Sequence, residues 1–278
     1  MKKHHKRDQR WLASYLLDGS TYRRLSERWG VGYMTAWRRV ERTLDASVDV
    51  DIVIASKDMS DVSILLLDAK HFRIHKNKYT LYVSAEALSG RPLAWILLSY
   101  SEKRIGYDRL LEVIHTENTP VQAIVSDWHH TIRASVREWY PRVVHQRCAF
   151  HALQEVFRTI CGKRLIPTPK GKLLWKRVRK IALQCESQKE ALVCFRRLQK
   201  TYPEHQKAWR KYERALPGIY EWTKRRDLLI PRTSNRIENL MGVIEQRFKS
   251  MRTMKNPSQL IKMISAFLKI KYKRPTKK

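Results

Sequence analysis

Three acidic side chains stand where they could share a divalent cation. Asp68 follows the apolar run 62–67, Asp127 follows the apolar run 121–126, and Glu238 lies near the start of a later amphipathic segment. Carboxylates that meet at one site repel each other, so a cation is their natural partner. Carboxylate oxygens are the ligands that Mg²⁺ or Mn²⁺ prefers. Two such ions can activate an attacking oxygen and stabilise a leaving oxygen. The chemistry predicted from these acids is phosphodiester cleavage or transfer.

Each acid also has a purely local interpretation. An Asp after a strand is commonly a turn or helix-capping residue, and Glu238 could form a capping box with Asn235. Glu245 lies two turns after Glu238 on the same stripe of the expected helix, beside its apolar face. The residues alone therefore leave both glutamates open as the third acid. Because both Asp residues follow apolar strands, we favour metal binding for that pair.

The segment 61–162 has the pattern of an α/β domain. Short apolar or alternating runs predict strands at 62–67, 78–84, 93–98, 121–126 and 143–148. Amphipathic runs predict helices at 107–115, at 131–139 and through 153–160. Three strands in an antiparallel meander are thus followed by helix, strand, helix, strand and helix, which is the element order of the ribonuclease H-like fold. In that order the strands before Asp68 and Asp127 are neighbours, so both carboxylates are expected at one sheet edge.

The first 45 residues predict a small all-α domain that binds DNA. An initial helix with apolar positions Trp11, Leu12, Tyr15 and Leu16 is expected to stop near Gly19. Two further apolar stripes flank the turn 30–32; they consist of Tyr22, Leu25 and Trp29, and of Met34, Trp37 and Val40. This is the pattern of a helix-turn-helix. Its second helix is predicted to present groups suited to base edges and phosphates, namely Tyr33, Thr35, Arg38, Arg39 and Arg42. A helical bundle that merely contains a glycine turn is the alternative.

The net charge of +31 predicts a polyanionic partner. The excess of basic residues lies in 1–45, 158–226 and 245–278, whereas the stretch 46–157 contains as many acidic as basic residues. Nucleic acid is the expected partner, because a surface of this charge binds it through counterion release. No membrane partner is expected, since no apolar stretch approaches the roughly 20 residues of a spanning helix. Four cysteines without a disulfide pattern predict a reducing, cytoplasmic location.

Residues 163–230 predict a basic α-helical insertion. One apolar stripe consists of Leu173, Leu174, Trp175, Val178, Ile181 and Ala182, and a later helix is expected to end at Pro217-Gly218. Candidate phosphate contacts on these helices are Lys176, Arg177, Arg179, Lys180, Arg196, Arg197 and Arg210. Trp175, Trp209 and Trp222 could stack on bases, although core packing is the commoner role of Trp at helical spacing.

These patterns divide the chain into five parts. The predicted parts are a helix-turn-helix domain (1–45), a linker (46–60), the first part of the catalytic core (61–162), the insertion (163–230) and a final part (231–278). The final part is expected to contain a core helix from Asn235, a second helix after Pro257 and a basic tail.

Four motifs, in this order, resemble the DDE transposases of bacterial insertion sequences in the Mutator-like superfamily. The motifs are Leu67-Asp68, Ser126-Asp127-Trp128-His129, Cys148-Ala149-Phe150-His151 and the hexapeptide that ends in Glu238. The resemblance covers about residues 60–270. It implies a ribonuclease H-like core with a helical insertion before the final glutamate. It also implies that Asp68, Asp127 and Glu238, rather than Glu245, bind catalytic Mg²⁺ (or Mn²⁺).

The function implied by this resemblance is DNA transposition. The protein would bind the terminal inverted repeats of its element, hydrolyse DNA at the element ends and join the 3′-hydroxyl to target DNA in the nucleoid. Because it acts on two ends, a homodimer on DNA is expected. The alternatives are a non-catalytic DNA-binding regulator derived from a transposase, and another ribonuclease H-like nuclease that cuts without joining.

Three further residues, His129, Cys148 and His151, match the family's motifs, but the sequence does not define their roles. Cys148 and His151 form a Cys-x-x-His signature, which is only half of a zinc site. Cys161 is a candidate third ligand there, but a fourth ligand has no recognisable spacing. His129, two residues after Asp127, is expected either to contact the scissile phosphate or to cap the following helix.

Overall fold

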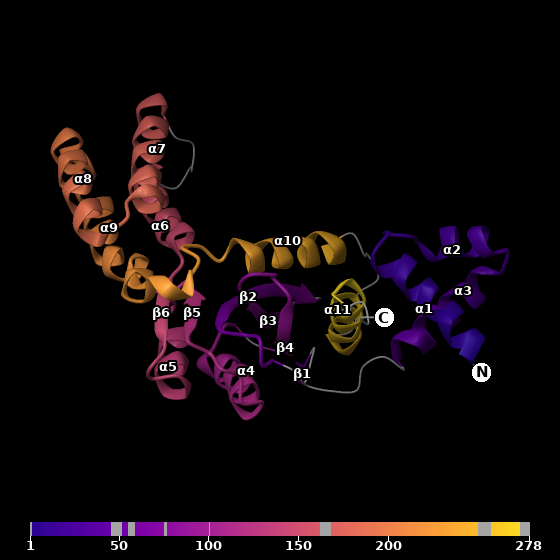
Figure 1. Ribbon diagram of the computed structural model, residues 1–278. Helices are drawn as coiled ribbons and strands as arrows, with labels where there is room; N and C mark the ends of the chain where they lie inside the picture. The colour runs from indigo at the N-terminus through magenta and orange to yellow at the C-terminus, as the bar shows by residue number, and fades with distance from the viewer. Residues whose placement is uncertain are drawn as a thin grey trace.

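A mixed six-stranded sheet lies at the centre of the protein (Figure 1), with strand order β1-β4-β3-β2-β5-β6. The computed structural model describes residues 2–45, 52–54, 59–74, 77–99, 101–161, 168–249 and 257–272. The strands are β1 (Ile52–Ile54), β2 (Ile64–Ile74), β3 (Asn77–Glu86), β4 (Pro92–Leu98), β5 (Ala123–Ser126) and β6 (Val144–Arg147).

The helices fall into three groups along the chain. The N-terminal group comprises α1 (Lys2–Leu16), α2 (Tyr22–Trp29) and α3 (Tyr33–Asp45). Helices α4 (Arg104–Thr116), α5 (His130–Trp139) and α6 (Ala149–Cys161) alternate with strands. The remainder are α7 (Pro169–Gln184), α8 (Gln188–Thr201), α9 (Gln206–Ile219), α10 (Asn235–Lys249) and α11 (Pro257–Lys271), with short 3₁₀ helices at Pro203–His205 and Glu221–Leu228.

The predicted order of strands and helices is observed. Strands β2, β3 and β4 form the antiparallel meander, and β5 and β6 extend the sheet in parallel beside β2. The fold is therefore α/β with a mixed sheet. One element was not predicted: the segment 46–60 was expected to be a linker, but Ile52–Ile54 form β1, which pairs with β4. A run of three apolar residues is too short to distinguish a strand from a linker by periodicity.

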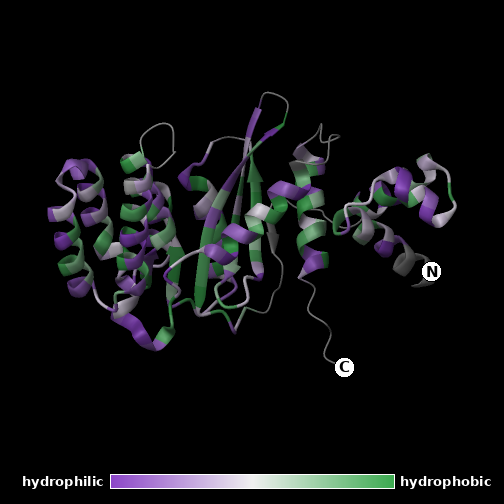
Figure 2. Ribbon diagram, turned by 90° about the horizontal axis from the view of Figure 1, so that it is seen from above, coloured by the Kyte–Doolittle hydropathy of each residue, from purple (hydrophilic) through white to green (hydrophobic). Residues whose placement is uncertain are grey.

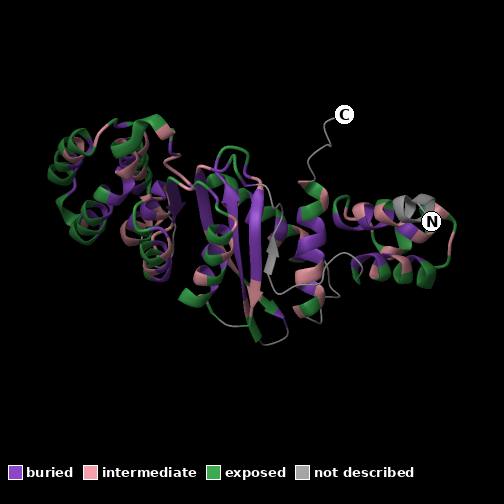
Figure 3. Ribbon diagram, turned by 60° about the horizontal axis from the view of Figure 1, so that its bottom comes forward, coloured by how far each residue is buried: buried purple, intermediate pink, exposed green. Residues whose placement is uncertain are grey.

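Helices cover both faces of the sheet. Successive side chains of a strand point to opposite faces, so Ile64 and Leu66 pack under α10 and α11, whereas Leu65 and Leu67 pack under α4 and α5. Figure 2 shows the apolar strands of the sheet, and Figure 3 shows that most of their length is buried. Because Asp68 shares its parity with Ile64 and Leu66, it lies on the face that α10 covers.

Strand β2 is longer than predicted. The apolar run suggested that the strand stops before Asp68, but it continues to Ile74 and pairs with β3 along that length, with Asp68 opposite Val83. The residues after Asp68 mix polar and apolar side chains and are mostly partly or fully exposed, so they do not extend the apolar run. Asp68 is thus held within a strand instead of in a loop.

The face of α3 that packs on the other N-terminal helices is rotated from the predicted stripe and shares only Val40 with it. Met34 and Trp37 were expected to be buried, but their side chains are 51% and 39% exposed. The buried positions of α3 are Ala36, Val40, Thr43 and Leu44. The small Ala36 side chain leaves room for the neighbouring helices, and the contact face is rotated accordingly. A hydrophobic-stripe argument overlooks such a face because it weights large side chains.

The insertion is a separate helical layer with its own core. Helices α7, α8 and α9 pack with α6, which was assigned to the first part of the catalytic core, around buried residues that include Leu174, Phe195 and Trp209. Two local predictions were wrong. Leu173, expected in the apolar stripe, is exposed. Helix α9 continues through Pro217 and Gly218 to Ile219.

Helices α10 and α11 connect the sheet to the N-terminal helices (Figure 1). The apolar positions predicted for α10 are all buried; they are Ile237, Leu240, Met241, Ile244 and Phe248. Arg247 of α10 donates hydrogen bonds to the backbone carbonyls of Leu16, at 2.6 Å, and Tyr15 at the end of α1. Of the basic tail expected after about Ile270, residues 273–278 lie outside the described residues. In the part of the chain that the structure describes, no helix has the length and hydrophobicity to cross a membrane.

Candidate active site

Asp68 lies on β2, and Asp127 directly follows the end of the adjacent strand β5. Leu66 of β2 is in register with Val125 of β5, so Asp68 and Asp127 each follow this pair by two residues. Both carboxylates are half-buried. Burial raises the pKa of Asp68 to about 7, and the Asp127 and Glu238 carboxylates raise it further. Two groups lower this pKa: His151, and the Ala69 N–H, which donates to Asp68 Oδ1 at 2.8 Å. The three predicted acids are therefore within electrostatic reach of one another.

Glu238 enters the site from the first turn of α10. Ser234 precedes this helix, and its hydroxyl donates to Glu238 Oε1 at 2.7 Å. The capping box with Asn235 is not formed; the partner of Glu238 is Ser234. An acid in the first turn of a helix is also favoured by the helix dipole. Glu245, the other candidate, lies further along α10, where Lys70 Nζ is 2.5 Å from its Oε2.

Cys148 joins the segments that carry Asp127 and Glu238. Its backbone N–H donates to the carbonyl of Ser126 at 2.7 Å, and its Sγ accepts a hydrogen bond from the N–H of Ser234 at 3.3 Å. The buried thiol donates to Glu238 Oε1 at 3.7 Å. Cys148 therefore contacts Ser126, which precedes Asp127, and Ser234, which precedes the helix that carries Glu238.

His151 lies one helical turn after Cys148 and faces the same acids. Its Nδ1 is 3.5 Å from Glu238 Oε1. Burial lowers the pKa of His151, but Cys148, Glu238 and Asp68 together raise it to about 9. The site therefore has a negative potential that a cation relieves. Cys161, the candidate third zinc ligand, is at the far end of α6 and is not part of this cluster.

The loop after β5 holds Asp127 through backbone contacts. Trp128 has a positive φ of 67°, a conformation that L-residues adopt only when their surroundings impose it. The N–H of His129 donates to Asp127 Oδ1 at 2.8 Å. His129 occupies the position before α5, but its side chain makes no capping hydrogen bond. Instead, its Nδ1 is 2.8 Å from Thr131 Oγ1.

Glu102 is a neighbour of this site that the sequence did not indicate. It accepts a hydrogen bond from the Tyr107 hydroxyl at 2.7 Å and lies 3.6 Å from His129 Nδ1. Burial, followed by the Glu102 carboxylate, raises the pKa of Tyr107. Ser234 lies within the hexapeptide that ends in Glu238, but the sequence did not indicate a role for it. Glu102 lies outside the four motifs, so only its spatial neighbours identify it.

Gly218 of α9 makes room for the Trp128 ring, and alanine there is expected to disturb the Asp127 loop. A Cβ atom at this position would lie 2.6 Å from Trp128 Cη2. We expect Gly218→Ala to lower the free energy of unfolding by about 1–3 kcal/mol through overpacking, as measured by urea denaturation. Gly242→Ala in α10 is the matched control, because its Cβ meets nothing within 4 Å; this variant should be neutral or slightly more stable. Equal stability of both variants would contradict the steric argument.

The N-terminal candidates for DNA contacts form an exposed surface on α3. Tyr33, Thr35, Arg38 and Arg42 are exposed, while Arg39 is half-buried with its guanidinium 5.1 Å from the centre of the Trp11 ring. Helix α2 ends at Trp29 and is capped by Gly30, whose φ is +58°. The left-handed conformation at Gly30 produces the sharp turn between α2 and α3. The exposed face of α3 is thus basic and lies opposite the face through which α3 packs on its neighbours.

The insertion presents its cations to solvent. All seven predicted phosphate contacts on it are exposed, namely Lys176, Arg177, Arg179, Lys180, Arg196, Arg197 and Arg210. Of the three tryptophans, Trp209 is buried and donates to the carbonyl of Tyr202 at 2.8 Å, and Trp175 packs against Phe157. The ring of Trp222 lies 4.3 Å from the Arg232 guanidinium. Core packing therefore accounts for Trp175 and Trp209.

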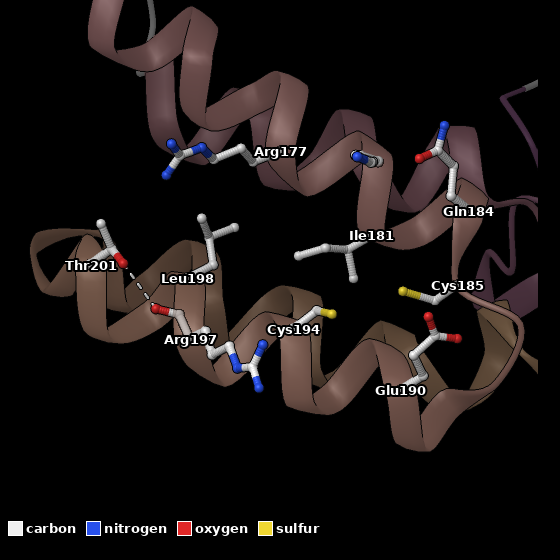
Figure 4. A pocket seen from close by; sticks show the side chains of 10 residues that line it. Arg177, Ile181, Gln184, Cys185, Glu190, Cys194, Arg197, Leu198 and Thr201 are labelled. Atoms are coloured by element: carbon white, nitrogen blue, oxygen red, sulfur yellow. Dashed lines mark hydrogen bonds between the residues drawn. The ribbon is translucent and has the colours of Figure 1, made fainter.

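A groove of about 460 Å³ separates α7 from α8. Figure 4 shows Ile181 on α7 facing Leu198 and Cys194 on α8, with Arg177 near Leu198, whereas the Arg197 guanidinium points away from α7. The floor is apolar and the rim is basic. At one end, burial together with Cys194 and Glu190 raises the pKa of Cys185 to about 11, so this thiol stays protonated at neutral pH. The groove contributes cations to the surface of the insertion.

Comparison with known proteins identifies the family. A comparison with curated proteins finds no match. The sequence model of the Mutator family of transposases matches residues 99–273. The matched segment contains Asp127, Cys148, His151 and Glu238, whereas Asp68 lies before it. Since the match covers more than half of the chain, the protein belongs to the Mutator family of transposases.

Proposed function

We propose that this transposase is a DDE enzyme with a ribonuclease H-like core, which cleaves the ends of its element and joins the 3′-hydroxyl to target DNA. The observation that carries the proposal is the convergence of Asp68, Asp127 and Glu238 from β2, the β5–α5 loop and α10. The electrostatic effect of Asp127 and Glu238 on Asp68 supports it. A binding protein without catalysis gains nothing from three mutually repelling carboxylates, which argues against the regulator.

The donor set fits Mg²⁺ or Mn²⁺. Three carboxylates supply hard oxygen ligands and leave coordination positions for DNA and water. When bound, the ions activate the attacking oxygen and stabilise the leaving oxygen of an in-line displacement. Each acid is fixed by its own contact. Asp68 lies within a paired strand, Asp127 accepts a hydrogen bond from the His129 N–H, and Glu238 accepts one from the Ser234 hydroxyl. Such support limits the reorganisation needed when the substrate binds.

Strand transfer by the purified protein is the direct test. The protein should join a pre-cut duplex carrying the element end to a plasmid target in the presence of Mg²⁺ or Mn²⁺, but not with Ca²⁺ or EDTA. Covalently joined product on a denaturing gel would support the proposal. Cleavage without joined product would favour the nuclease alternative, and neither product despite DNA binding would favour the regulator.

The affinity for Mg²⁺ is expected to depend on pH through Asp68. With a pKa of about 7 in the metal-free protein, this carboxyl must lose a proton before it can bind the ion. The apparent affinity should fall by up to about tenfold per pH unit below 7 and should level off above pH 8. Titration calorimetry between pH 5.5 and 8.5 measures this, with Asp108→Asn on α4 as a control for surface charge. An affinity independent of pH would contradict the role of Asp68.

The same shift predicts how stability changes with pH. The folded protein keeps the Asp68 proton to about pH 7, whereas an unfolded Asp loses it near its ordinary value of 3.8. Between these values the folded state binds more protons, so this group's contribution to stability falls as pH rises. Mg²⁺ should offset that loss above pH 7.

We further propose that α2 and α3 act as a helix-turn-helix with α3 in the major groove. The exposed Arg38 and Arg42 side chains support this role, as does the glycine turn at Gly30. The exposed cations of the insertion would add contacts to phosphates, and a homodimer would hold two ends. These contacts involve double-stranded DNA at the terminal inverted repeats and in the target, and they predict association with the nucleoid.

Removal of α3 cations should weaken DNA binding in a salt-dependent way. If Arg38 and Arg42 each bind one phosphate, Arg38→Ala and Arg42→Ala should each reduce the slope of log affinity against log salt concentration by about 1. Fluorescence anisotropy with a labelled duplex measures the slope. Arg137→Ala on α5 is the matched control, because Arg137 is exposed on a helix that covers the opposite face of the sheet from α10. A similar change of slope in the control would indicate that only overall charge matters.

A further inference from the structure

Three different donor atoms converge beside the proposed catalytic centre. Sγ of Cys148, a ring nitrogen of His151 and a carboxylate oxygen of Glu238 all lie within 4.8 Å of one another. The sulfur is 3.7 Å and the His151 Nδ1 is 3.5 Å from the same oxygen, Glu238 Oε1. Sulfur and imidazole are ligands of zinc-like ions and are unsuited to Mg²⁺. This cluster therefore differs in chemistry from the three-carboxylate set with which it shares Glu238.

Two of the three separations match those of a tetrahedral zinc site, and the third, between Cys148 Sγ and the His151 ring nitrogen, is at most 4.8 Å. With Zn–S near 2.3 Å and Zn–N or Zn–O near 2.1 Å, tetrahedral geometry places sulfur and oxygen about 3.6 Å apart and nitrogen and oxygen about 3.4 Å apart. The corresponding distances in the protein are 3.7 Å and 3.5 Å. Glu238 Oε1 is thus already placed for an ion shared with either partner. The fourth position would be open to water.

The polar groups of the cluster also favour a bound cation. His151 Nδ1 is buried and has no hydrogen bond of good geometry, although it lies 3.5 Å from Glu238 Oε1. A bound cation would give this buried nitrogen a direct partner. The N–H of Ser234 points at Cys148 Sγ, at 3.3 Å, and its hydroxyl donates to Glu238 Oε1. Donors that point at the ligand atoms are the usual support of a metal site, since they stabilise thiolate and carboxylate.

We propose that Cys148, His151 and Glu238 bind a thiophilic divalent cation such as Zn²⁺, and that this ion inhibits the enzyme because it engages Glu238. The inhibition rests on the proposed function; the binding does not. On binding, Zn²⁺ displaces the thiol proton of Cys148 and the extra ring proton of His151 to solvent, and Glu238 Oε1 becomes a ligand of the same ion as the sulfur. Glu238 is then no longer free to complete the Mg²⁺ site with Asp68 and Asp127. In the absence of such an ion, Cys148 and His151 only position Glu238.

Cobalt binding tests the site without DNA or activity. Co²⁺ added to the reduced full-length protein should produce the intense near-ultraviolet sulfur-to-cobalt band and the visible bands of tetrahedral Co²⁺, at one equivalent, and Zn²⁺ should displace it. Cys148→Ser should abolish the sulfur band. His151→Ala and Glu238→Gln should each weaken binding by at least tenfold. Cys161→Ser and Cys194→Ser are the matched controls and should retain the band.

The cobalt experiment can support or overturn the site even if one variant folds poorly. Circular dichroism establishes that each variant is folded, and the half-buried His151 supplies a second variant should Cys148→Ser be unstable. The absence of a sulfur band in the wild-type protein, or a band that persists in folded Cys148→Ser, would overturn the site. Octahedral Co²⁺ spectra without sulfur character would indicate binding at the carboxylates only, and would overturn it too.

Inhibition is measured separately in the strand-transfer assay. With Mg²⁺ in excess, free Zn²⁺ at ten times its dissociation constant should lower the joining rate about tenfold by occupancy, and a zinc chelator should restore the rate. Joining that is unaffected by bound Zn²⁺ would overturn the inhibitory role. A cobalt site in a protein that never joins DNA would refute the proposed function alone, and joining without a cobalt site would refute this inference alone.

Discussion

Asp68→Ala should lower the rates of end cleavage and strand transfer by about 10³-fold or more, while the affinity for DNA stays within twofold of the wild type. Loss of a carboxylate that holds catalytic ions removes several kcal/mol of transition-state stabilisation, and about 4 kcal/mol corresponds to 10³-fold in rate. DNA binding is unaffected because Asp68 lies on the sheet, apart from the cations of α3. Single-turnover assays with pre-cut ends measure the rates, and anisotropy measures the affinity.

The fold is expected to tolerate this change. The raised pKa of Asp68 means that its charged form is disfavoured in the folded protein, so removal of the carboxyl should not lower the free energy of unfolding at pH 8 without Mg²⁺. Asp68→Asn provides a second variant of nearly the same shape and should be equally inactive. Full joining activity in either variant would refute the assignment of Asp68 as a metal ligand.

Glu238→Gln and Glu245→Gln form a matched pair on one helix with opposite expected results. Glu238→Gln should lower the joining rate by about 10³-fold, because Glu238 shares its surroundings with Asp68 and His151. Glu245→Gln should change the rate less than threefold. Its partner is Lys70, and loss of a partly exposed ion pair costs at most about 1 kcal/mol of stability. Both rates come from the same strand-transfer assay.

The pair resolves an ambiguity that helix geometry alone could not. Both glutamates lie on the same stripe of α10, two turns apart, so either could reach the sheet. The reverse result, with Glu245→Gln inactive and Glu238→Gln active, would show that the Mg²⁺ ligand comes from the middle of α10. Loss of activity in both variants would indicate that Glu238 and Glu245 are both required for strand transfer.

Much of the fold followed from local patterns. The succession of strands and helices from β2 to α6 was predicted because each element buries one face, and burial of one face imposes a period on the sequence. The apolar positions of α10 were predicted for the same reason. The adjacency of the strands that carry Asp68 and Asp127 followed from the element order. Short or small-residue features were not predictable in this way, as β1 and the packing of α3 through Ala36 show.

The sequence by itself determined the inventory of this protein: three acids at the ends or starts of periodic segments, a basic helical insertion, and a Cys-x-x-His signature between them. These features are local, and periodicity and residue chemistry suffice to read them. Only the tertiary structure decided which of them meet. It placed Glu238 rather than Glu245 beside His151, continued β2 past Asp68, and joined the Asp127 loop to the start of α10 through Cys148. Contacts between residues so far apart in the chain depend on sheet register and helix placement, which no single segment encodes.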